Sequence, residues 1–312
     1  MKVLHLEENH PALIDGLQAL GFQNDTAYSD SLDEILVRLD QYDGLITRSK
    51  YPIDETFLSK AKKLKFIGRV GAGLENIDVK AVASRNIHLI NSPEGNRNAV
   101  GEHALGMLLS LMNRLNIGHN SIQSGHWDRE GHRGWELSGR TVGIIGYGNT
   151  GKNFAKRISG FDVNTLCYDI LKNIGDQYAQ QVNWKTLLAE CEIVSLHIPQ
   201  TEQTLGMINK EFIASMTHPF WLINTARGLA VVAEDLVDGL KSHKIMGAGL
   251  DVLEYETRSF SSIFNEKKLP PALKYLMKAD TVLLSPHVAG WSRESHIKLA
   301  TTIVEKVKKL FF

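Results

Sequence analysis

Short apolar runs alternate with amphipathic segments over the first hundred residues. A helix is expected over Pro11–Leu20, because a proline stands near its start and Gly21 lies just past its end. Another is expected to open at Ser31, which forms the S-x-x-E pattern of a capping box. The runs between predict strands at Lys2–Leu6, Gly44–Thr47, Phe66–Val70 and Ile87–Ile90. Strands that alternate with helices in this way predict parallel βαβ units and a doubly wound sheet.

A long helical pattern follows, from Asn98 to about Arg114. Its small and apolar residues fall on two sides, which suits a helix lying between two domains. The next stretch, Ser121–Gly139, is polar, rich in glycine and weakly periodic, so an extended arm is expected. Its two tryptophans, Trp127 and Trp135, are interpreted as packing anchors rather than ligand contacts.

The alternation restarts at Thr141 and continues to about Leu284, which predicts a second doubly wound α/β domain. Its strands are expected at Thr141–Ile145, Val163–Tyr168, Ile193–His197, Trp221–Asn224, Gly247–Asp251 and Val282–Leu284. A last helical pattern, Ser292–Lys309, closes the chain.

Composition narrows the functional classes. The chain has 312 residues, 43% of them hydrophobic, which is enough for two folded domains and argues against disorder. Its formal net charge is zero, so no basic footprint for nucleic acid is expected. No signal peptide or run of membrane-spanning length is visible, and no membrane partner is expected. Cys167 and Cys191 are interpreted as buried free thiols of a cytoplasmic protein, with no metal site.

A glycine-rich turn, G-Y-G-N-T-G at 146–151, follows the strand Thr141–Ile145 and opens a helical pattern at Lys152–Ser159. Alone such a turn is weak evidence, and three turn glycines are the alternative. In this context it predicts a dinucleotide site with phosphates at a helix N-terminus. Asp169 ends the next strand, 18 residues past Gly151, where a carboxylate binds the adenosine ribose and repels a 2′-phosphate. We therefore expect NAD rather than NADP.

Three polar residues far apart in the chain are the candidate catalytic groups: Arg227 in N-T-A-R-G, Glu256 in L-D-V-L-E-Y-E, and His287 in S-P-H-V-A-G. The arginine can clamp a carboxylate and polarise a carbonyl. The histidine can move a proton, and an ionised glutamate would orient it and favour its charged form. Glu254 competes with Glu256 for that role. With a nicotinamide, the trio predicts hydride transfer on a 2-keto or 2-hydroxy acid.

Further segments, spread over nearly the whole chain, share one pattern. They are L-I-T-R-S (45–49), G-R-V-G-A-G-L-E-N-I-D (68–78), I-N-S-P-E-G-N (90–96), E-H-A-L-G-M (102–107), L-H-I-P-Q-T (196–201) and G-A-G-L-D-V-L-E-Y-E (247–256). With the glycine turn and the trio, they resemble the D-isomer-specific 2-hydroxyacid dehydrogenases, which include D-3-phosphoglycerate dehydrogenase, glyoxylate/hydroxypyruvate reductase and D-lactate dehydrogenase. The resemblance is specific for the family and much less so for the substrate.

The resemblance implies an NAD-binding Rossmann domain (100–285) inserted into a flavodoxin-like substrate domain (1–99 and 286–312). The active site would lie in a cleft between them, and a homodimer would form through the cofactor domains and an arm at 121–139. The family spacing D-V-x-x-x-E selects Glu256 over Glu254. Thr257 replaces the proline that usually follows, and the stretch to His287 is longer than usual, which implies a subfamily-specific loop at Thr257–Pro271.

The resemblance also distributes the binding roles. Cofactor contacts are expected from Gly146, Tyr147, Gly148, Asn149, Thr150, Gly151, Asp169, His197, Pro199, Thr225, Ala226, Asp251 and Gly290. Substrate contacts are expected from Ser49, Val70, Gly71, Ala72, Gly73, Asn76 and Trp291. In the second set, Val70–Gly73 would offer backbone N–H groups to the carboxylate, although a tight turn between strand and helix explains the same glycines. Lys50 would either meet a phosphate or stay solvated.

An NAD-dependent oxidoreductase of D-2-hydroxy acids is therefore the main expectation, with 3-phosphoglycerate as one candidate substrate and glyoxylate or hydroxypyruvate as the alternative. Formate dehydrogenases pair their histidine with glutamine, and Glu256 argues against that activity. A second class remains open: NAD(H)-sensing corepressors of the same family, which bind the cofactor without turnover.

Overall fold

The computed structural model describes residues 1–256 and 269–312, and it divides into two compact units. The smaller unit comprises Met1–Arg97 and Trp291–Phe312, and the larger unit, Asn98–Gly290, is inserted between these two stretches. Residues 286–290, which the sequence assigned to the substrate domain, belong to the larger unit, and His287 is among them.

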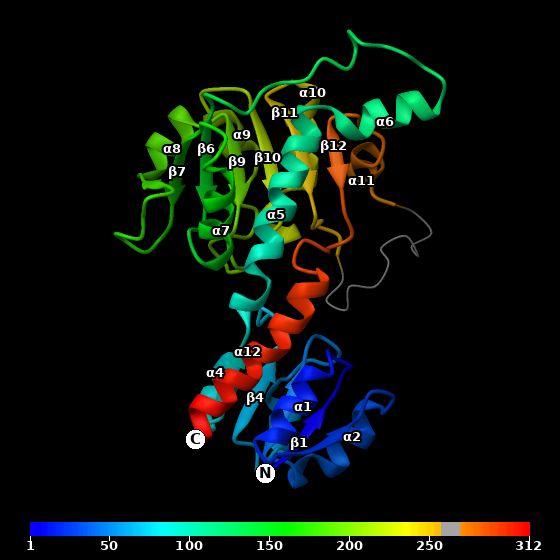
Figure 1. The fold of residues 1–312 in the computed structure, drawn as a ribbon, viewed down its shortest axis with the longest axis vertical. Helices are drawn as coiled ribbons and strands as arrows, with labels where there is room; N and C mark the ends of the chain where they lie inside the picture. The colour runs from blue at the N-terminus through cyan, green and yellow to red at the C-terminus, as the bar shows by residue number, and fades with distance from the viewer. Residues whose placement is uncertain (257–268) are drawn as a thin grey trace. The chain divides into compact units, whose positions relative to one another are not determined.

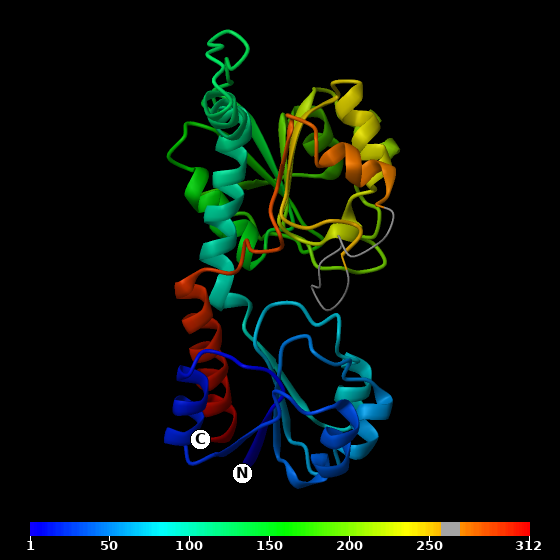
Figure 2. The same ribbon diagram turned by 90° about the vertical axis from the view of Figure 1, so that its right-hand side faces the viewer.

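The smaller unit is a parallel α/β sheet with helices on both faces (Figures 1 and 2). Among its described residues the strand order is β2-β1-β3-β4-β5, the flavodoxin-like order. Its strands are β1 (Lys2–His5), β2 (Gln23–Thr26), β3 (Gly44–Thr47), β4 (Phe66–Arg69) and β5 (His88–Asn91). Its helices are α1 (Ala12–Ala19), α2 (Leu32–Arg38), α3 (Glu55–Lys60), α4 (Val79–Ser84) and α12 (Arg293–Phe311), with a 3-10 turn at Leu39–Gln41.

Two cores fill the smaller unit, one on each face of the sheet. Helices α1 and α12 pack with β1, β3 and β4 through residues such as Leu13, Phe66 and Ile303. Helices α2, α3 and α4 cover the opposite face. The predicted capping box is present, because Ser31 and Glu34 each accept from the backbone N–H of the other at the start of α2. α12 opens with a second capping box, between Ser292 and Ser295.

The larger unit is built on a parallel sheet in the order β12-β11-β10-β9-β6-β7-β8, as far as the described residues show. Its strands are β6 (Thr141–Ile145), β7 (Asn164–Tyr168), β8 (Gln180–Gln181), β9 (Ile193–Leu196), β10 (Phe220–Asn224), β11 (Ile245–Leu250) and β12 (Val282–Leu284). Its helices are α5 (Pro93–Met112, which begins in the smaller unit), α6 (Leu115–Gln123), α7 (Asn149–Ile158), α8 (Trp184–Glu190), α9 (Lys210–Ser215), α10 (Ala233–Lys241) and α11 (Pro271–Leu276), with a 3-10 turn at Gly228–Ala230. The strand order reverses between β6 and β9, which marks the ligand-binding edge of a Rossmann sheet.

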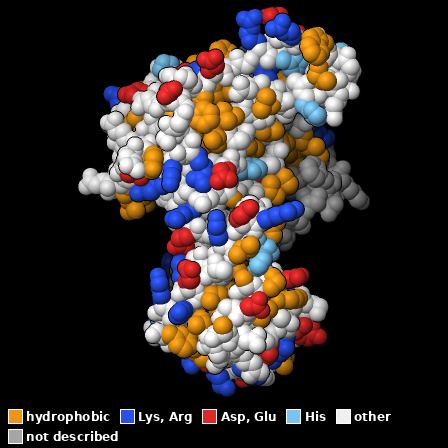
Figure 3. Space-filling view, in the orientation of Figure 1, with side chains coloured by type: hydrophobic (Ala, Val, Ile, Leu, Met, Phe, Trp, Pro, Cys, Tyr) orange, Lys and Arg blue, Asp and Glu red, His pale blue; other side chains and the backbone are white. Residues whose placement is uncertain are grey.

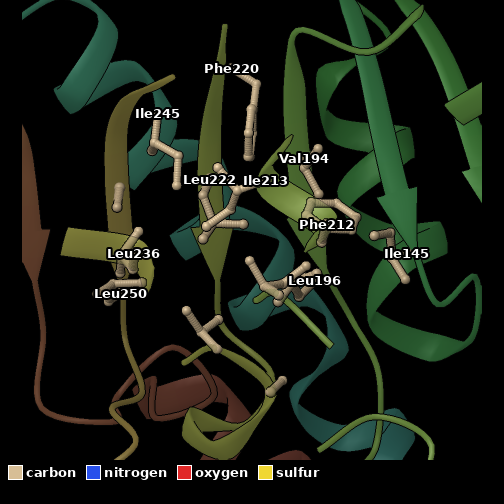
Figure 4. Close-up of a cluster of buried hydrophobic side chains, with 14 of the residues drawn as sticks. Ile145, Val194, Leu196, Phe212, Ile213, Phe220, Leu222, Leu236, Ile245 and Leu250 are labelled. Carbon is tan, nitrogen blue, oxygen red and sulfur yellow. The ribbon is translucent and has the colours of Figure 1, made fainter. Parts of the chain in front are cut away.

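Helices α5 and α7 cover one face of this sheet, and α8 to α11 cover the other (Figure 2). The second face is closed by aliphatic and aromatic residues of the central strands, such as Ile145, Leu196 and Leu222, packed against Phe212 and Leu236 (Figure 4). Because both faces are buried, central strands such as β9 and β10 are buried along their whole length rather than on alternate residues. The sheet is therefore a rigid base for the loops at its carboxyl edge.

Two predicted elements need correction. The helix expected from Asn98 begins at Pro93. The stretch expected to be an extended arm from Ser121 is helical through Gln123, since α6 reaches that residue. No side chain of α6 is buried, and Trp127 in the following segment is 81% exposed. Hydrophobic, histidine and charged side chains lie side by side on this part of the surface (Figure 3).

No helix in the part of the chain that the structure describes is long and apolar enough to span a bilayer.

Candidate active site

The glycine turn after β6 is shaped by close contacts that exclude side chains. Gly146 has φ +89°, and a Cβ on it would lie 2.5 Å from the carbonyl oxygen of His197. A Cβ on Gly151 would lie 2.2 Å from the carbonyl oxygen of Gly146. Gly148, in contrast, has nothing within 4 Å of its Cβ position and is exposed. Two glycines therefore make the turn tight, and the third leaves open space above it.

Helix α7 begins directly at this open position. Asn149 and Thr150 are its first two residues, and its N-cap, Gly148, provides no side-chain cap. The N–H groups of the first turn therefore face outward without a capping side chain. A ten-residue helix that starts at the switch point of a parallel sheet is a well-suited phosphate site.

Asp169, at the end of β7, is fixed beside the turn. Its Oδ2 accepts from the backbone N–H of Tyr147 (2.7 Å) and its Oδ1 from that of Leu171 (2.9 Å). A carboxylate has about four acceptor positions, so capacity for ribose hydroxyls remains. The Tyr147 side chain points into the core instead, where its hydroxyl donates to Asp176 and burial raises its pKa. Tyr147 can thus contribute to a cofactor site through its backbone.

The loops after β9 and β10 complete this edge. The hydroxyl of Thr225 is buried and has no hydrogen-bond partner among the described residues. Buried polar groups are normally hydrogen-bonded, so this hydroxyl is a candidate to bind a ligand. Pro199 is exposed, and its carbonyl accepts from the hydroxyl of Thr204. The tight turn, the open helix N-terminus, Asp169 and Thr225 together fit a dinucleotide.

His197 lies differently from the other predicted cofactor residues. Its ring is buried in the core, tilted against Phe154 at 5.3 Å, with Nε2 2.9 Å from the hydroxyl oxygen of Ser195. Burial lowers the pKa of His197 to about 3. The imidazole is therefore a neutral core group, and only the His197 backbone lies against the glycine turn.

Arg227 follows β10 on a turn held by the buried amide of Asn224. That side chain accepts from the N–H of Ala226 and donates to the carbonyl of Arg227, both at 3.0 Å. Nη1 of Arg227 donates to the carbonyl of Ala226 (2.6 Å). A Cβ on Gly228 would lie 1.9 Å from the carbonyl oxygen of Leu253. The glycine after Arg227 thus lets this turn pack directly on the segment that carries Glu256.

Two glutamates of that segment have different partners. Oε2 of Glu254 accepts from the backbone N–H of Ala233, the first residue of α10, at 2.8 Å. Oε2 of Glu256 lies 2.7 Å from Nδ1 of His287, and its Oε1 accepts from the N–H of Leu253. The geometry therefore resolves the choice between them, because Glu254 stabilises a helix N-terminus while Glu256 pairs with the histidine.

Asp251 organises the segment around His287. Its carboxylate is 1% exposed and accepts from the N–H groups of Val288 and Ala289, each at 2.8 Å. It also accepts from the hydroxyl of Ser285 (2.6 Å). The predicted role of Asp251 was cofactor binding, and the structure adds this internal one. Gly290 follows as the last residue of the larger unit.

In the smaller unit, the predicted substrate loop follows β4. The N–H of Gly71 donates to the hydroxyl of Ser92, and a Cβ on Gly71 would fall 1.6 Å from Nη1 of Arg69. The N–H groups of Ala72 and Gly73 have no acceptor within the described chain, so these two can offer an anion nest. Val70, expected to share this role, is buried, and its N–H donates to the carbonyl of Thr47 instead (2.9 Å). The amide of Asn76 donates to the carbonyl of Tyr51, which ties the loop to its neighbour.

The loops after β1 and β3 meet at the switch point of the smaller sheet. Glu7, directly after β1, accepts from the backbone N–H groups of Arg48 and Ser49. Sequence reasoning missed Glu7, although its place at the carboxyl end of a strand beside the switch point could have revealed it. Lys50 is partly exposed, and its amino group donates to the carbonyls of Ala27, Tyr28 and Asp30.

Trp291 begins the return to the smaller unit. It is 47% exposed, and its ring lies under the guanidinium of Arg48, 4.4 Å from the ring centroid. Its other neighbour is the ring of His296, at 5.0 Å. The unusual loop after Glu256 lies outside the described residues as far as 268.

Residues 105–289 match the D-isomer specific 2-hydroxyacid dehydrogenase, NAD binding domain. The chain belongs to this dehydrogenase family. It is 33% identical over 280 residues to hydroxypyruvate reductase of Thermotoga maritima, covering 89% of this chain and 87% of that one. It is 32% identical over 310 residues to D-3-phosphoglycerate dehydrogenase of Archaeoglobus fulgidus, covering 98% of this chain but only 56% of that protein.

Solved structures give the same picture. D-lactate dehydrogenase of Aquifex aeolicus, complexed with NAD and lactic acid, superposes with a TM-score of 0.84 at 26% identity, covering 99% of this family member and 95% of that chain. The family assignment from sequence is confirmed, as is the two-domain Rossmann architecture. This dehydrogenase-family chain spans about half the length of several of the curated phosphoglycerate dehydrogenases that it matches.

Proposed function

We propose that this chain is an NAD-dependent oxidoreductase that transfers a hydride between nicotinamide and C2 of a D-2-hydroxy acid or its 2-keto acid. The observation that carries the proposal is the contact of Glu256 with Nδ1 of His287, at 2.7 Å, within the unit that bears the dinucleotide turn. A histidine braced by a carboxylate, on the same unit as a dinucleotide turn, is a suitable acid–base group for a carbonyl. The larger unit would be the NAD domain and the smaller one the substrate domain.

Each catalytic residue has a distinct task. Because Glu256 engages Nδ1, proton exchange with the C2 oxygen is assigned to Nε2 of His287. Glu256 fixes the ring orientation and stabilises the imidazolium. Arg227 binds the substrate carboxylate and stabilises negative charge on the C2 oxygen. The N–H groups of Ala72 and Gly73 are proposed as additional carboxylate donors. Bound NAD supplies the hydride carrier.

A small unphosphorylated 2-keto acid, such as glyoxylate or hydroxypyruvate, is favoured as substrate over a phosphorylated one. The reason is Lys50, whose amino group donates to three backbone carbonyls and so has no N–H left for a phosphate. The 33% identity to a hydroxypyruvate reductase supports the same choice. 3-Phosphoglycerate remains the rival substrate, supported by the relatives named as D-3-phosphoglycerate dehydrogenase.

We further propose a homodimer in a reducing cytoplasm. The dimer is supported by α6, which buries no side chain, and by the exposed Trp127 next to it. The compartment is supported by the two buried free thiols. Sedimentation of the wild-type chain and of Trp127→Ala tests the dimer, because a dimer held by this arm should dissociate more readily in the variant.

The activity is tested by NADH oxidation with a panel of acids: glyoxylate, hydroxypyruvate, pyruvate, 2-ketoglutarate and phosphohydroxypyruvate, repeated with NADPH. We expect turnover with NADH, and a loss of about 10²- to 10⁴-fold in His287→Ala. Preference for phosphohydroxypyruvate would reverse the substrate choice and leave the reaction class standing. Tight NADH binding without turnover on any acid would overturn the enzyme proposal and favour an NAD(H)-sensing corepressor.

A further inference from the structure

The backbone of His287 is held in a conformation that a histidine does not adopt readily. Its φ is +56°, in the left-handed region. For a residue other than glycine this region is uncommon and persists only where neighbouring contacts impose it. The contacts here come largely from Asp251, whose carbonyl oxygen accepts from the N–H of His287 at 2.8 Å and whose carboxylate accepts from the next two N–H groups.

The direction of the Asp251 carboxylate therefore decides where the His287 ring lies. Ser285, in the same segment, also donates to that carboxylate, through its hydroxyl at 2.6 Å. Because this hydroxyl donates its proton to Asp251, its oxygen can only accept a hydrogen bond from any other partner.

His103, on α5, is that partner. Its Nε2 lies 3.0 Å from the Ser285 oxygen and 3.6 Å from Oδ1 of Asp251. Because the Ser285 oxygen can only accept, Nε2 of His103 carries the ring proton. The bonds then run in one direction, from His103 to Ser285 to Asp251, and end on the segment that carries His287. A chain of this kind is cooperative, and removing one member weakens the others.

We propose that His103 is a positioning residue for His287, acting through Ser285 and Asp251. It does not touch the proposed reacting atoms. It holds the Ser285 hydroxyl turned toward Asp251, and thereby keeps the Asp251 carboxylate on the amides that set the backbone of His287. The inference deepens the proposed function and rests on it only for its kinetic consequence, because the positioning itself is a property of the protein without substrate.

The first test compares three single variants. His103→Leu removes the donor, and His103→Gln retains an N–H donor. His218→Leu is the control, since His218 is exposed and its side chain makes no hydrogen bond or ion pair within the described part of the larger unit. We expect His103→Leu to lower kcat roughly 10- to 100-fold with little change in the KM for NADH, because small misplacements of a catalytic group have effects of this size. His103→Gln should regain most of the loss, and His218→Leu should match the wild type.

Non-additivity provides the second test. Ser285→Ala interrupts the same chain one step later, so the double variant His103→Leu, Ser285→Ala should be no worse than the poorer single variant. Additive losses would mean that the two residues act separately, and wild-type kcat in His103→Leu would show that no positioning occurs. Equal losses in His103→Leu and His103→Gln would point to ring packing alone. Each of these three outcomes overturns the proposal.

A spectroscopic measurement separates this inference from the proposed function. In the protein without ligands, the hydrogen-bonded ring N–H proton of His287 should give a downfield proton resonance, assigned by its loss in His287→Gln. We expect His103→Leu to shift or broaden that resonance and His218→Leu to leave it in place. An unchanged resonance in His103→Leu contradicts the positioning role even in an active enzyme. A shifted resonance in a protein that turns over no 2-keto acid keeps the positioning role while the proposed activity fails.

Discussion

Nδ1 of His287 and Oε2 of Glu256 lie 2.7 Å apart, and the Oε1 of the same carboxylate is fixed by the N–H of Leu253. Both carboxylate oxygens of Glu256 are therefore engaged: Oε2 contacts the His287 ring, and Oε1 accepts from the backbone N–H of Leu253. This arrangement makes the ring orientation a property of the larger unit alone, independent of any substrate.

Glu256→Gln should lower kcat by about 10- to 100-fold while leaving the fold intact. The amide can still bond Nδ1, but it loses the negative charge that stabilises the imidazolium. Steady-state kinetics with the best acid of the panel measures the change.

The matched control is Glu254→Gln, two residues away. Its carboxylate lies at the N-terminus of α10, so this variant should lose about 0.3–1 kcal/mol of stability with kcat close to that of the wild type. The reverse result, with Glu254→Gln inactive and Glu256→Gln active, would contradict the pairing.

Gly228→Ala should be severely impaired, because its new Cβ would overlap the carbonyl oxygen of Leu253, at 1.9 Å. The overlap must push the Arg227 turn and the Glu256 segment apart. We expect a drop in melting temperature together with a loss of turnover of at least about 10²-fold, as for other small displacements of catalytic groups. Circular dichroism and kinetics on the same sample measure both.

Gly160→Ala is the control for that substitution, since nothing lies within 4 Å of its Cβ position. It should keep wild-type turnover and stability within about 0.5 kcal/mol, as surface substitutions usually do. Normal turnover in Gly228→Ala would show that the turn and the Glu256 segment need not touch.

Asp169→Ala should weaken NADH binding and reduce discrimination against NADPH. The carboxylate is the group that would bind the ribose hydroxyls and repel a 2′-phosphate, and its two backbone bonds hold it beside the glycine turn. Loss of one such charged hydrogen bond corresponds to about 1.5–3 kcal/mol, or roughly a tenfold to hundredfold rise in Kd for NADH. Fluorescence titration with both cofactors measures it, and an unchanged preference for NADH would remove Asp169 from the cofactor site.

Much of the fold could be predicted from hydrophobic pattern. The predicted ranges for β3 and β6 coincide with the observed strands, because each is a short apolar run bounded by turns. β2 was missed: its sequence is Gln-Asn-Asp-Thr, and it is a strand only because its backbone pairs with β1 at the sheet edge. Polar edge strands carry no apolar signal that periodicity can detect.

The start of α5 was also missed, for a different physical reason. Gly95 looks like a helix breaker, yet its missing side chain lets α5 approach the backbone of Leu299 on α12, where a Cβ would lie 2.7 Å from an amide nitrogen. That contact joins residues about two hundred positions apart, so no local pattern contains it. The contact of His103 with Ser285, 182 residues apart, escaped prediction in the same way.

Among the candidate site residues, the family spacing could name a catalytic partner but not the direction of every side chain. The spacing D-V-x-x-x-E selected Glu256 over Glu254, and in the structure Glu256 lies beside His287 while Glu254 accepts from the first N–H of α10. His197 shows the opposite case. The family resemblance assigned it to the cofactor, whereas the strand register turns its ring into the core beside Phe154.

The burial of His197 predicts how stability depends on pH. Its pKa is lowered from 6.5 to about 3 because the ring is enclosed and cannot be charged without solvent. The unfolded chain therefore binds this proton at a higher pH than the folded one. The stabilisation from the neutral ring is complete above pH 6.5 and is lost progressively as the pH falls toward 3. At about 1.4 kcal/mol per unit, the loss reaches an upper limit of roughly 5 kcal/mol.

His197→Gln should therefore flatten the fall in melting temperature on acidification between neutral pH and about pH 4, even if it lowers stability at neutral pH through poorer packing against Phe154. The amide can keep the bond to Ser195 and cannot be protonated in this range. The matched control is His218→Gln, an exposed histidine that should keep the wild-type slope. If the wild-type and His197→Gln curves run parallel, the ring is not held neutral by burial, and the acid sensitivity of the protein has to come from its carboxylates.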